Sequence, residues 1–249
     1  MSPLDGKRAL VTGGSKGIGR AIALRLAEDG ALVTVLGRDA AALAKTAREI
    51  RGKSLIADVT DAPGLSAAIT AAGPLDILIN NAGAALSKPF LDQQEAEWQE
   101  MLSVNLLSAV TGCRLVLPGM QARGWGRIVN IASTAGLKGY AYTTAYCAAK
   151  HALIGLTRAL ALEIARSPVT INAVCPGFTD TDLVARAVEV IEAETGRSAE
   201  QARAALTRFN PQNRLVEPEE VAEAVAFLCR NEAAAMTGQS LIIAGGEVM

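Results

Sequence analysis

The segment RALVTGGSKGIG, residues 8–19, sets the architecture of the chain. Its first five residues form an apolar run typical of a buried β-strand, and a helical pattern begins at Ile18. The glycines between them permit a tight turn, and the backbone N–H groups at the start of the helix attract an anion. A purely structural turn would also account for glycines. Their place between a strand and a helix favours binding of a dinucleotide pyrophosphate, which predicts these contact residues: Gly13, Ser15, Lys16, Gly17, Ile18 and Gly19.

Beyond this segment, short apolar runs alternate with helical patterns along the whole chain. Continuous apolar strands separated by helices are typical of a parallel sheet covered on both faces. We therefore predict an α/β fold, a Rossmann-type doubly wound parallel sheet of about seven strands with helices on both faces. The predicted strands are Arg8–Thr12, Leu32–Leu36, Leu55–Ala57, Leu75–Ile79, Arg127–Ala132, Val169–Val174 and Ser240–Ala244. The predicted helices are Ile18–Asp29, Asp39–Arg51, Ala62–Ala72, Gln94–Gln121, one from Tyr146 to about Ala165, and one from Pro218.

No linker, low-complexity tract or internal repeat divides the sequence. We expect a single dinucleotide-binding and catalytic domain over residues 1–249. A polar, helix-prone insertion at about 179–211 follows the sixth strand, and we expect it to act as a lid over the site.

The composition limits the partners that the protein can have. The formal net charge is −1, which argues against nucleic acid or an anionic membrane surface as a main partner. The longest apolar runs are too short to span a bilayer, and no secretory signal is recognisable. Four cysteines are scattered without a Cys-x-x-Cys pair, and there is one histidine. We expect reduced thiols in a cytoplasmic protein, no membrane association and no metal site.

The end of the second predicted strand bears on the choice of dinucleotide. Proteins that prefer NAD usually carry an acid there, about 20 residues after the glycines, but this chain has Arg38. A guanidinium suits a 2′-phosphate, and Lys16 provides a second cation, so we expect NADP(H) to be favoured over NAD(H). A solvated arginine beside a helix cap at Asp39 is the alternative. Asp58, followed by Val59, is placed to accept a hydrogen bond from adenine or to cap the next helix.

Tyr146 and Lys150 lie four residues apart in a predicted helix, which puts them on one face, one turn apart. A free tyrosine titrates near pH ~10, so a tyrosine that acts as a base near neutrality needs a lowered pKa. A nearby ammonium in a partly dry cleft has that effect. The pair therefore indicates acid–base catalysis, although an ordinary exposed tyrosine and lysine would show the same spacing.

Taken together, the motifs resemble the short-chain dehydrogenase/reductases over essentially the whole chain. The motifs that carry the resemblance stand in the expected order: the TGGSKGIG turn from Thr12, Asp58, Asn80-Asn81-Ala82-Gly83, Asn105, Ser133, Tyr146 with Lys150, and Pro176-Gly177. Each motif alone is ambiguous, whereas their joint occurrence by chance is very improbable.

The resemblance implies a role for each of these residues. Tyr146 is the general acid/base, Ser133 hydrogen-bonds the carbonyl oxygen, and Lys150 lowers the pKa of Tyr146 and holds the nicotinamide ribose. Asn105 maintains a local helix irregularity. The remaining implied contacts with the dinucleotide are Asp58, Val59, Asn81, Ala82, Gly83, Pro176, Gly177, Thr179 and Thr181.

Within that family the sequence looks closest to the 3-oxoacyl reductases, which implies reduction of a 3-oxoacyl thioester or similar ketone with NADP(H). Two alternatives stay open: an NAD-dependent dehydrogenase of a 3-hydroxyacyl-CoA or secondary alcohol, and a non-catalytic nucleotide sensor. The family is mostly tetrameric, so we expect a homotetramer. The small side chains of Ala148, Ala152 and Ala159 suit contact between subunits, although burial inside one subunit would also explain them.

Overall fold

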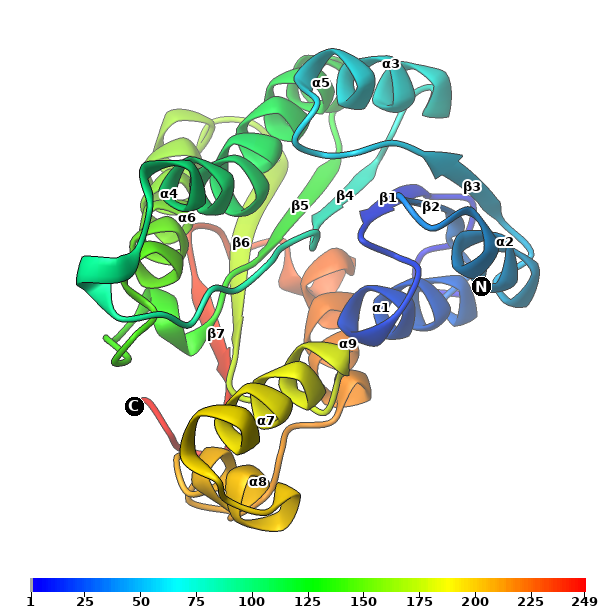
Figure 1. Cartoon of the computed structure of the whole chain (residues 1–249). Coiled ribbons are helices and arrows are strands. Elements are labelled where there is room, and N and C mark those ends of the chain that lie inside the picture. Colours follow the sequence, from blue (N-terminus) through cyan, green and yellow to red (C-terminus); the bar gives the residue numbers. More distant parts are fainter. Residues whose placement is uncertain (1) are drawn as a thin grey trace.

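The computed structural model describes residues 2–249 and contains one parallel sheet in the order β3-β2-β1-β4-β5-β6-β7 (Figure 1). The chain leaves β1 to one side for β2 and β3, and returns to its other side for β4, so the direction of winding reverses between β1 and β4. This confirms the predicted doubly wound sheet. The strands are β1 Arg8–Thr12, β2 Leu32–Gly37, β3 Lys53–Ile56, β4 Ile77–Asn80, β5 Gly126–Ile131, β6 Val169–Pro176 and β7 Ser240–Ile243.

Helices cover both faces of the sheet because successive strand residues point to opposite sides and both sides are apolar. Val11 and Ile79 pack under α1, α2 and α9, whereas Leu10 and Leu78 pack under α3 and α5, with α6 beside them. The helices are α1 Gly17–Glu28, α2 Ala40–Glu49, α3 Ala62–Ala72, α4 Glu95–Leu102, α5 Ser108–Ala122, α6 Thr144–Glu163 and α9 Pro218–Cys229. Short 3₁₀ turns occupy Phe90–Asp92, Thr134–Gly136 and Asn231–Ala233.

Most predicted elements agree with the structure to within two residues at each end; the fourth strand, for example, begins at Ile77 rather than at Leu75. Two differences have a clear cause. The third strand runs from Lys53 to Ile56 rather than from Leu55 to Ala57, because β3 is an edge strand whose exposed Lys53 and Ser54 hide the apolar signal. The predicted helical region 94–121 is divided into α4, a π-helical turn and α5. Among residues 2–249, only Glu95–Ala122 is long and apolar enough to cross a membrane by length and composition, and it packs against α3, α6 and the sheet.

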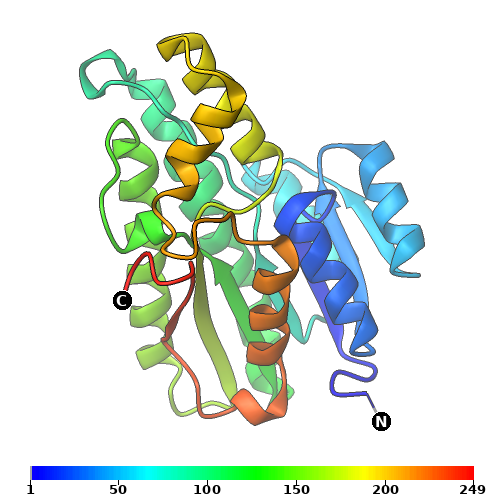
Figure 2. The same cartoon turned by 90° about the horizontal axis from the view of Figure 1, so that it is seen from below.

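The segments that follow the strands gather at the carboxyl end of the sheet. The predicted insertion 179–211 forms α7, Asp182–Thr195, and α8, Ala199–Thr207, which project beyond this end (Figure 2). Ligands of open parallel sheets bind outside the carboxyl ends of the strands, near the reversal of winding. A ligand site is therefore expected at the carboxyl ends of β1 and β4.

Candidate active site

The glycine turn after β1 is tightly packed against its neighbours. Gly13 has a φ of +66°, and a Cβ on Gly14 would lie 2.6 Å from a methyl group of Val35 in β2. A Cβ on Gly19 would lie 2.2 Å from the Gly13 carbonyl oxygen. Larger residues would push the turn away from the sheet and α1 away from the turn, so glycine is needed for the packing itself.

The first turn of α1 has no side-chain cap and no acid. Lys16 occupies the N-cap position without a side-chain hydrogen bond, whereas α2 is capped by Asp39, whose carboxylate accepts from Ala42 N at 3.0 Å. The backbone N–H groups at this helix start are thus directed to solvent at the carboxyl end of the sheet. A phosphate group fits this arrangement.

Asn81 connects the glycine turn to the end of β4 by hydrogen bonds. Its amide nitrogen donates to Thr12 O at 2.9 Å, and the Thr12 hydroxyl accepts from the backbone N of Asn81 and Ala82, both at 3.0 Å. The amide nitrogen of the Asn81 side chain and its backbone N are therefore both hydrogen-bonded within the protein, so any contact of Asn81 with a dinucleotide would use its oxygen atoms. Thr12 was not predicted, although a polar residue at the end of a buried strand is a usable signal.

Arg38 and Asp58 meet at the ends of β2 and β3. Their side chains approach to 3.5 Å, and 81% of the Arg38 side chain is exposed. The Asp58 carboxylate accepts from Thr60 N at 2.9 Å and from the Thr60 hydroxyl at 2.7 Å. These bonds, and more weakly Arg38, lower the pKa of Asp58. Asp58 thus shapes its own loop, while Val59 is buried in the core.

Lys16 points toward α7 rather than toward Arg38. Its ammonium forms an exposed ion pair with Asp182 at 2.7 Å. Thr181 lies beside it, 3.1 Å from the place of a Cβ on Gly17. The start of α7 therefore covers the glycine turn. Lys16 and Arg38 do not lie side by side, so in this structure they do not form the expected pair of cations around a 2′-phosphate.

Ser133, Tyr146 and Lys150 come together between β5 and α6. Lys150 is 4% exposed, and its ammonium lies 5.7 Å from the centre of the Tyr146 ring and donates to Ile131 O at 2.8 Å. Ser133 follows β5 directly, its hydroxyl accepts from Ala135 N at 3.0 Å, and it lies close enough to Tyr146 to act on the pKa of that phenol. The packing of α6 on the sheet brings these three groups to one point.

The pKa of Tyr146 differs from the sequence expectation. Burial raises it to about 12, and the hydrogen bond with Ser133 acts weakly in the opposite direction. Burial also lowers the pKa of Lys150 to about 8. Lys150 is not among the groups that shift the pKa of Tyr146 in the protein alone, where burial dominates, so the expected lowering by Lys150 stays a prediction.

Asn105 lies inside the π-helical turn Ser103–Leu107, between α4 and α5. It is 2% exposed, and its amide nitrogen donates to Ala84 O at 2.9 Å and to Met101 O at 3.0 Å. A Cβ on Gly83 would lie 2.8 Å from Asn105 Oδ1 and 3.6 Å from Lys150 Nζ. Asn105 is thus a buried neighbour of Lys150 and not a helix residue that faces solvent.

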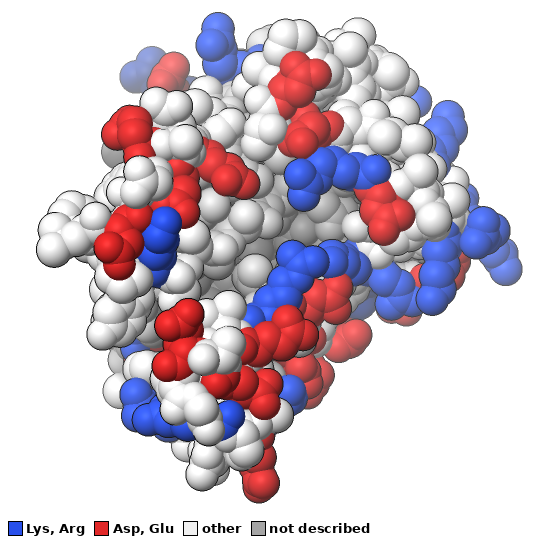
Figure 3. Space-filling model, viewed as in Figure 1, with Lys and Arg blue, Asp and Glu red and all other residues white. Residues whose placement is uncertain are grey.

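The segment after β6 closes the other side of the site. Pro176 ends β6, Gly177 N donates to Ile243 O at 3.0 Å, and the Thr179 hydroxyl donates to Gly177 O at 3.1 Å. The chain then reaches Thr181 over the glycine turn. Apart from Ile18 and Val59, which pack into the protein, the predicted site residues lie around the carboxyl end of the sheet, and Figure 3 shows a hollow on this face with charged side chains at its rim.

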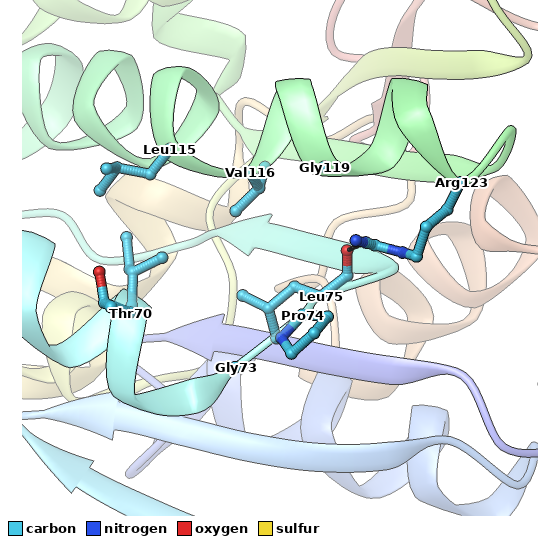
Figure 4. A pocket seen from close by; sticks show the side chains of 9 residues that line it. Thr70, Gly73, Pro74, Leu75, Leu115, Val116, Gly119 and Arg123 are labelled. Atoms are coloured by element: carbon cyan, nitrogen blue, oxygen red, sulfur yellow. Dashed lines mark hydrogen bonds between the residues drawn. The ribbon is translucent and has the colours of Figure 1, made fainter.

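A cavity of about 360 Å³ lies elsewhere, between α3 and α5 (Figure 4). It is lined by Thr70, Leu75, Leu115 and Arg123, among others, and the Arg123 guanidinium donates to Leu75 O. Leu75 precedes β4, so this cavity belongs to the amino end of the sheet. It does not contact Ser133, Tyr146 or Lys150.

Comparison with known proteins gives one consistent answer. The model of the family "short chain dehydrogenase" matches residues 7–191. The 3-oxoacyl-[acyl-carrier-protein] reductase FabG of Vibrio harveyi is 40% identical, over 99% of this chain and 99% of its own. D-beta-hydroxybutyrate dehydrogenase of Cupriavidus necator is 39% identical, over 98% of this chain and 99% of its own.

A solved structure agrees with these relatives. The NADPH complex of an actinorhodin polyketide ketoreductase variant superimposes with a TM-score of 0.94 at 38% identity, and the match covers 99% of each chain. The fold, the family model and the full-length relatives agree. The chain therefore belongs to the short chain dehydrogenase family of NAD(P)-dependent oxidoreductases.

Proposed function

We propose that this enzyme uses NADPH to reduce the keto group of a 3-oxoacyl thioester or a similar ketone. The observation that carries the proposal is the meeting of Ser133, Tyr146 and Lys150 at the carboxyl end of the sheet, opposite the glycine turn. The relatives named as 3-oxoacyl and polyketide ketoreductases support the substrate class.

Burial raises the pKa of Tyr146, so the phenol carries its proton at neutral pH in the protein alone, as a proton donor must. A bound NADPH would supply a hydride to the carbonyl carbon, and negative charge then develops on the carbonyl oxygen. The Ser133 and Tyr146 hydroxyls stabilise that charge where it forms. Tyr146 next transfers its proton to the oxygen as a general acid.

Residues around this centre hold the reactants and limit the access of water. Lys150 provides the buried cation nearest to Tyr146, and the start of α1 provides N–H groups for a pyrophosphate. We further propose that the insertion 179–211 is a lid. The ion pair between Lys16 and Asp182 supports this role because it joins α7 to the glycine turn.

The preference for NADPH rests on Arg38, whose guanidinium is exposed at the end of β2 and available to a 2′-phosphate. The neighbouring Asp58 supports the second candidate, an NAD-dependent dehydrogenase of a 3-hydroxyacyl or similar secondary alcohol. The similarity to D-beta-hydroxybutyrate dehydrogenase points the same way.

The deciding experiment is a panel of 3-oxoacyl thioesters and simple ketones, each assayed with NADPH and with NADH. We expect oxidation of NADPH that depends on a 3-oxoacyl thioester, and a higher kcat/KM with NADPH than with NADH. Equal use of NADH would remove the assignment of Arg38. Faster oxidation of 3-hydroxy substrates with NAD would establish the second candidate instead.

We also propose a homotetramer in the cytoplasm. Ala148 and Ala159 are exposed, as is Leu162 one turn further along α6, so these small side chains are not buried inside one subunit. A close helix–helix contact with another copy would cover them. The four cysteines are free and buried, which suits a reducing compartment. Sedimentation equilibrium would reject the tetramer if the mass found were that of one chain.

A further inference from the structure

The C-terminal tail carries a buried acid close to the catalytic serine. Only 1% of the Glu247 side chain is exposed. Its Oε1 atom accepts a hydrogen bond from the Tyr140 hydroxyl and pairs with the Lys138 ammonium at 3.1 Å. Its Oε2 atom is buried without a hydrogen-bond partner among the described residues, and a Cβ on Gly177 would lie 2.8 Å from it.

Tyr140 connects this acid to the residue after Ser133. The hydroxyls of Tyr140 and Thr134 are 2.7 Å apart. A carboxylate can only accept, so Tyr140 donates to Glu247 and must accept from Thr134. The hydrogen bonds therefore run in one direction, from Thr134 through Tyr140 to Glu247. Burial and the contact with Glu247 raise the pKa of Tyr140, so its hydroxyl keeps the proton that this order requires.

The same cluster joins three segments that are distant in the sequence. The Tyr140 ring packs edge-on against Phe178, with ring centres 5.9 Å apart, and against Phe209, at 5.7 Å. Lys138 lies over the rings of Tyr140 and Phe209. The loop 134–144, the residue after Gly177 and the end of α8 thus meet around Glu247.

Two glycines allow the tail to reach this place. Gly245 and Gly246 have φ angles of +60° and +94°, and a Cβ on Gly245 would lie 2.0 Å from Asn210 Oδ1. A buried ion pair is weak as a source of stability, because its desolvation cost offsets much of the attraction. Its main effect here is therefore the geometry that it imposes on the loop between Ser133 and Tyr146.

We propose that Glu247 is a positioning residue, which holds the loop 134–144 through Tyr140 and Lys138 and so fixes the Ser133 hydroxyl for the carbonyl oxygen. This inference rests on the proposed ketone reduction for its kinetic consequence, whereas the tethering of the loop is independent of it. Glu247 contacts no reacting atom in this scheme.

The test compares Glu247→Gln with Glu232→Gln, which makes the same change at an exposed glutamate in the 3₁₀ turn after α9. Gln keeps the size of the side chain, removes the pairing with Lys138, and lets the amide turn its NH₂ toward Tyr140. Two quantities are measured: hydrogen exchange of the amides in residues 134–144, and kcat with the KM values of ketone and NADPH.

We expect Glu247→Gln to speed exchange in the loop and to lower kcat about 10-fold, since a 1 Å misplacement in an active site costs on the order of 100-fold. The KM for NADPH and the melting temperature should change little. Tyr140→Phe should give a similar loss, and the double variant should lose no more than either single variant, because both act through one network. Glu232→Gln should leave both quantities unchanged.

Several results would overturn the proposal. They are an unchanged kcat, a lower kcat with unchanged loop exchange, or losses of the two single variants that multiply in the double variant. If the wild-type enzyme reduces no ketone, the proposed function fails, and the exchange data alone decide whether Glu247 holds the loop.

Discussion

The two ends of β5 each carry a buried cation, and the two cations are held in different ways. Arg127, at the amino end, is 2% exposed, donates to Gly126 O at 2.9 Å and lies 4.5 Å from the centre of the Trp125 ring. Lys150 donates to Ile131 O at the carboxyl end and lies 5.7 Å from the centre of the Tyr146 ring. Neither forms an ion pair with an acid within residues 2–249.

The surroundings of the two cations explain why only one end suits catalysis. At the amino end, nearby arginines are neutralised by protein acids: Asp29 pairs with Arg25 at 2.6 Å and with Arg230 at 2.8 Å. At the carboxyl end, the Lys150 ammonium donates to a backbone carbonyl, and burial lowers its pKa to about 8. The arginines around Arg127 are paired with an acid, whereas the carboxyl end keeps its cation beside a tyrosine.

Tyr146→Phe is the strongest test of the proposed difference between the two ends of β5. General acid catalysis contributes about 10²–10⁴-fold, so we expect ketone-dependent NADPH oxidation to fall roughly 10³-fold, or about 4 kcal/mol of barrier. Binding of NADPH, measured by fluorescence titration, should be nearly unchanged.

Tyr142→Phe is the matched control for this change, because Tyr142 is an exposed tyrosine in the turn just before α6. It should retain wild-type kcat. A Tyr146→Phe enzyme with more than a tenth of wild-type kcat would show that another group supplies the proton, and the carboxyl end would lose its proposed role.

The amino end is tested by Asp29→Asn. Burial alone would raise the pKa of Asp29, but the hydrogen bonds from Arg230 and Arg25 outweigh it and lower the pKa. Breaking a buried ion pair typically costs about 3–5 kcal/mol, so we expect the free energy of unfolding at pH 7 to fall by about 3 kcal/mol. Urea unfolding measures this change, and kcat per folded enzyme should not change.

The pH dependence of this stability difference has a defined sign. Because the pKa of Asp29 is lowered on folding, its contribution is present above the ordinary carboxyl pKa of about 4 and is lost as the pH falls through the folded value. The gap between wild type and Asp29→Asn should therefore narrow in acid. A gap that widens in acid would show that the network does not stabilise the charged carboxylate.

Lys150→Met tests the cation at the carboxyl end. We expect kcat to fall about 100-fold, since the substitution removes a preorganised charge beside the developing oxyanion. Burial lowers the pKa of Lys150 from 10.5 to about 8, so the unfolded chain binds more protons between these pH values. Wild-type stability should therefore rise, by about 3 kcal/mol in total, as the pH increases from 8 to 10.5.

Lys150→Met should lack this rise, which chemical denaturation at several pH values can measure. A wild-type protein with the same pH profile as the variant would mean that the buried lysine is not destabilised in its charged form. The electrostatic contrast between the two ends of β5 would then be wrong.

Most of the fold could be predicted from the sequence because its signals are local. Buried strands such as Arg8–Thr12 are continuous apolar runs, and Asp39 before α2 is a recognisable cap that the structure contains. The edge strand β3 was misplaced by two residues because exposed polar side chains carry no such signal. The assignment of residues 1–249 to one domain stays a prediction.

The site was less predictable where it depends on contacts between distant segments. Residue types and order pointed to Ser133, Tyr146 and Lys150, but the pKa of Tyr146 depends on burial, which spacing along a helix does not show. The pairing of Lys16 with Asp182 joins residues 166 positions apart. Glu247 was missed for the same reason, although an acid after an apolar strand and two glycines is unusual enough to mark it.

The smallest expected effect is that of Arg38→Ala, which tests whether the carboxyl end offers a cation to a second phosphate. A charge-assisted hydrogen bond of about 1.4 kcal/mol corresponds to 10-fold in affinity, so the KM for NADPH should rise roughly 10-fold while that for NADH stays within about 2-fold. Arg48→Ala, an exposed arginine on α2 outside the site, should change neither value. If Arg38→Ala raises the KM for NADPH and for NADH alike, the guanidinium contacts a group that both dinucleotides share, such as adenine. If it changes neither, the exposed side chain serves only Asp58, and the discrimination between the two dinucleotides must come from the backbone after β2.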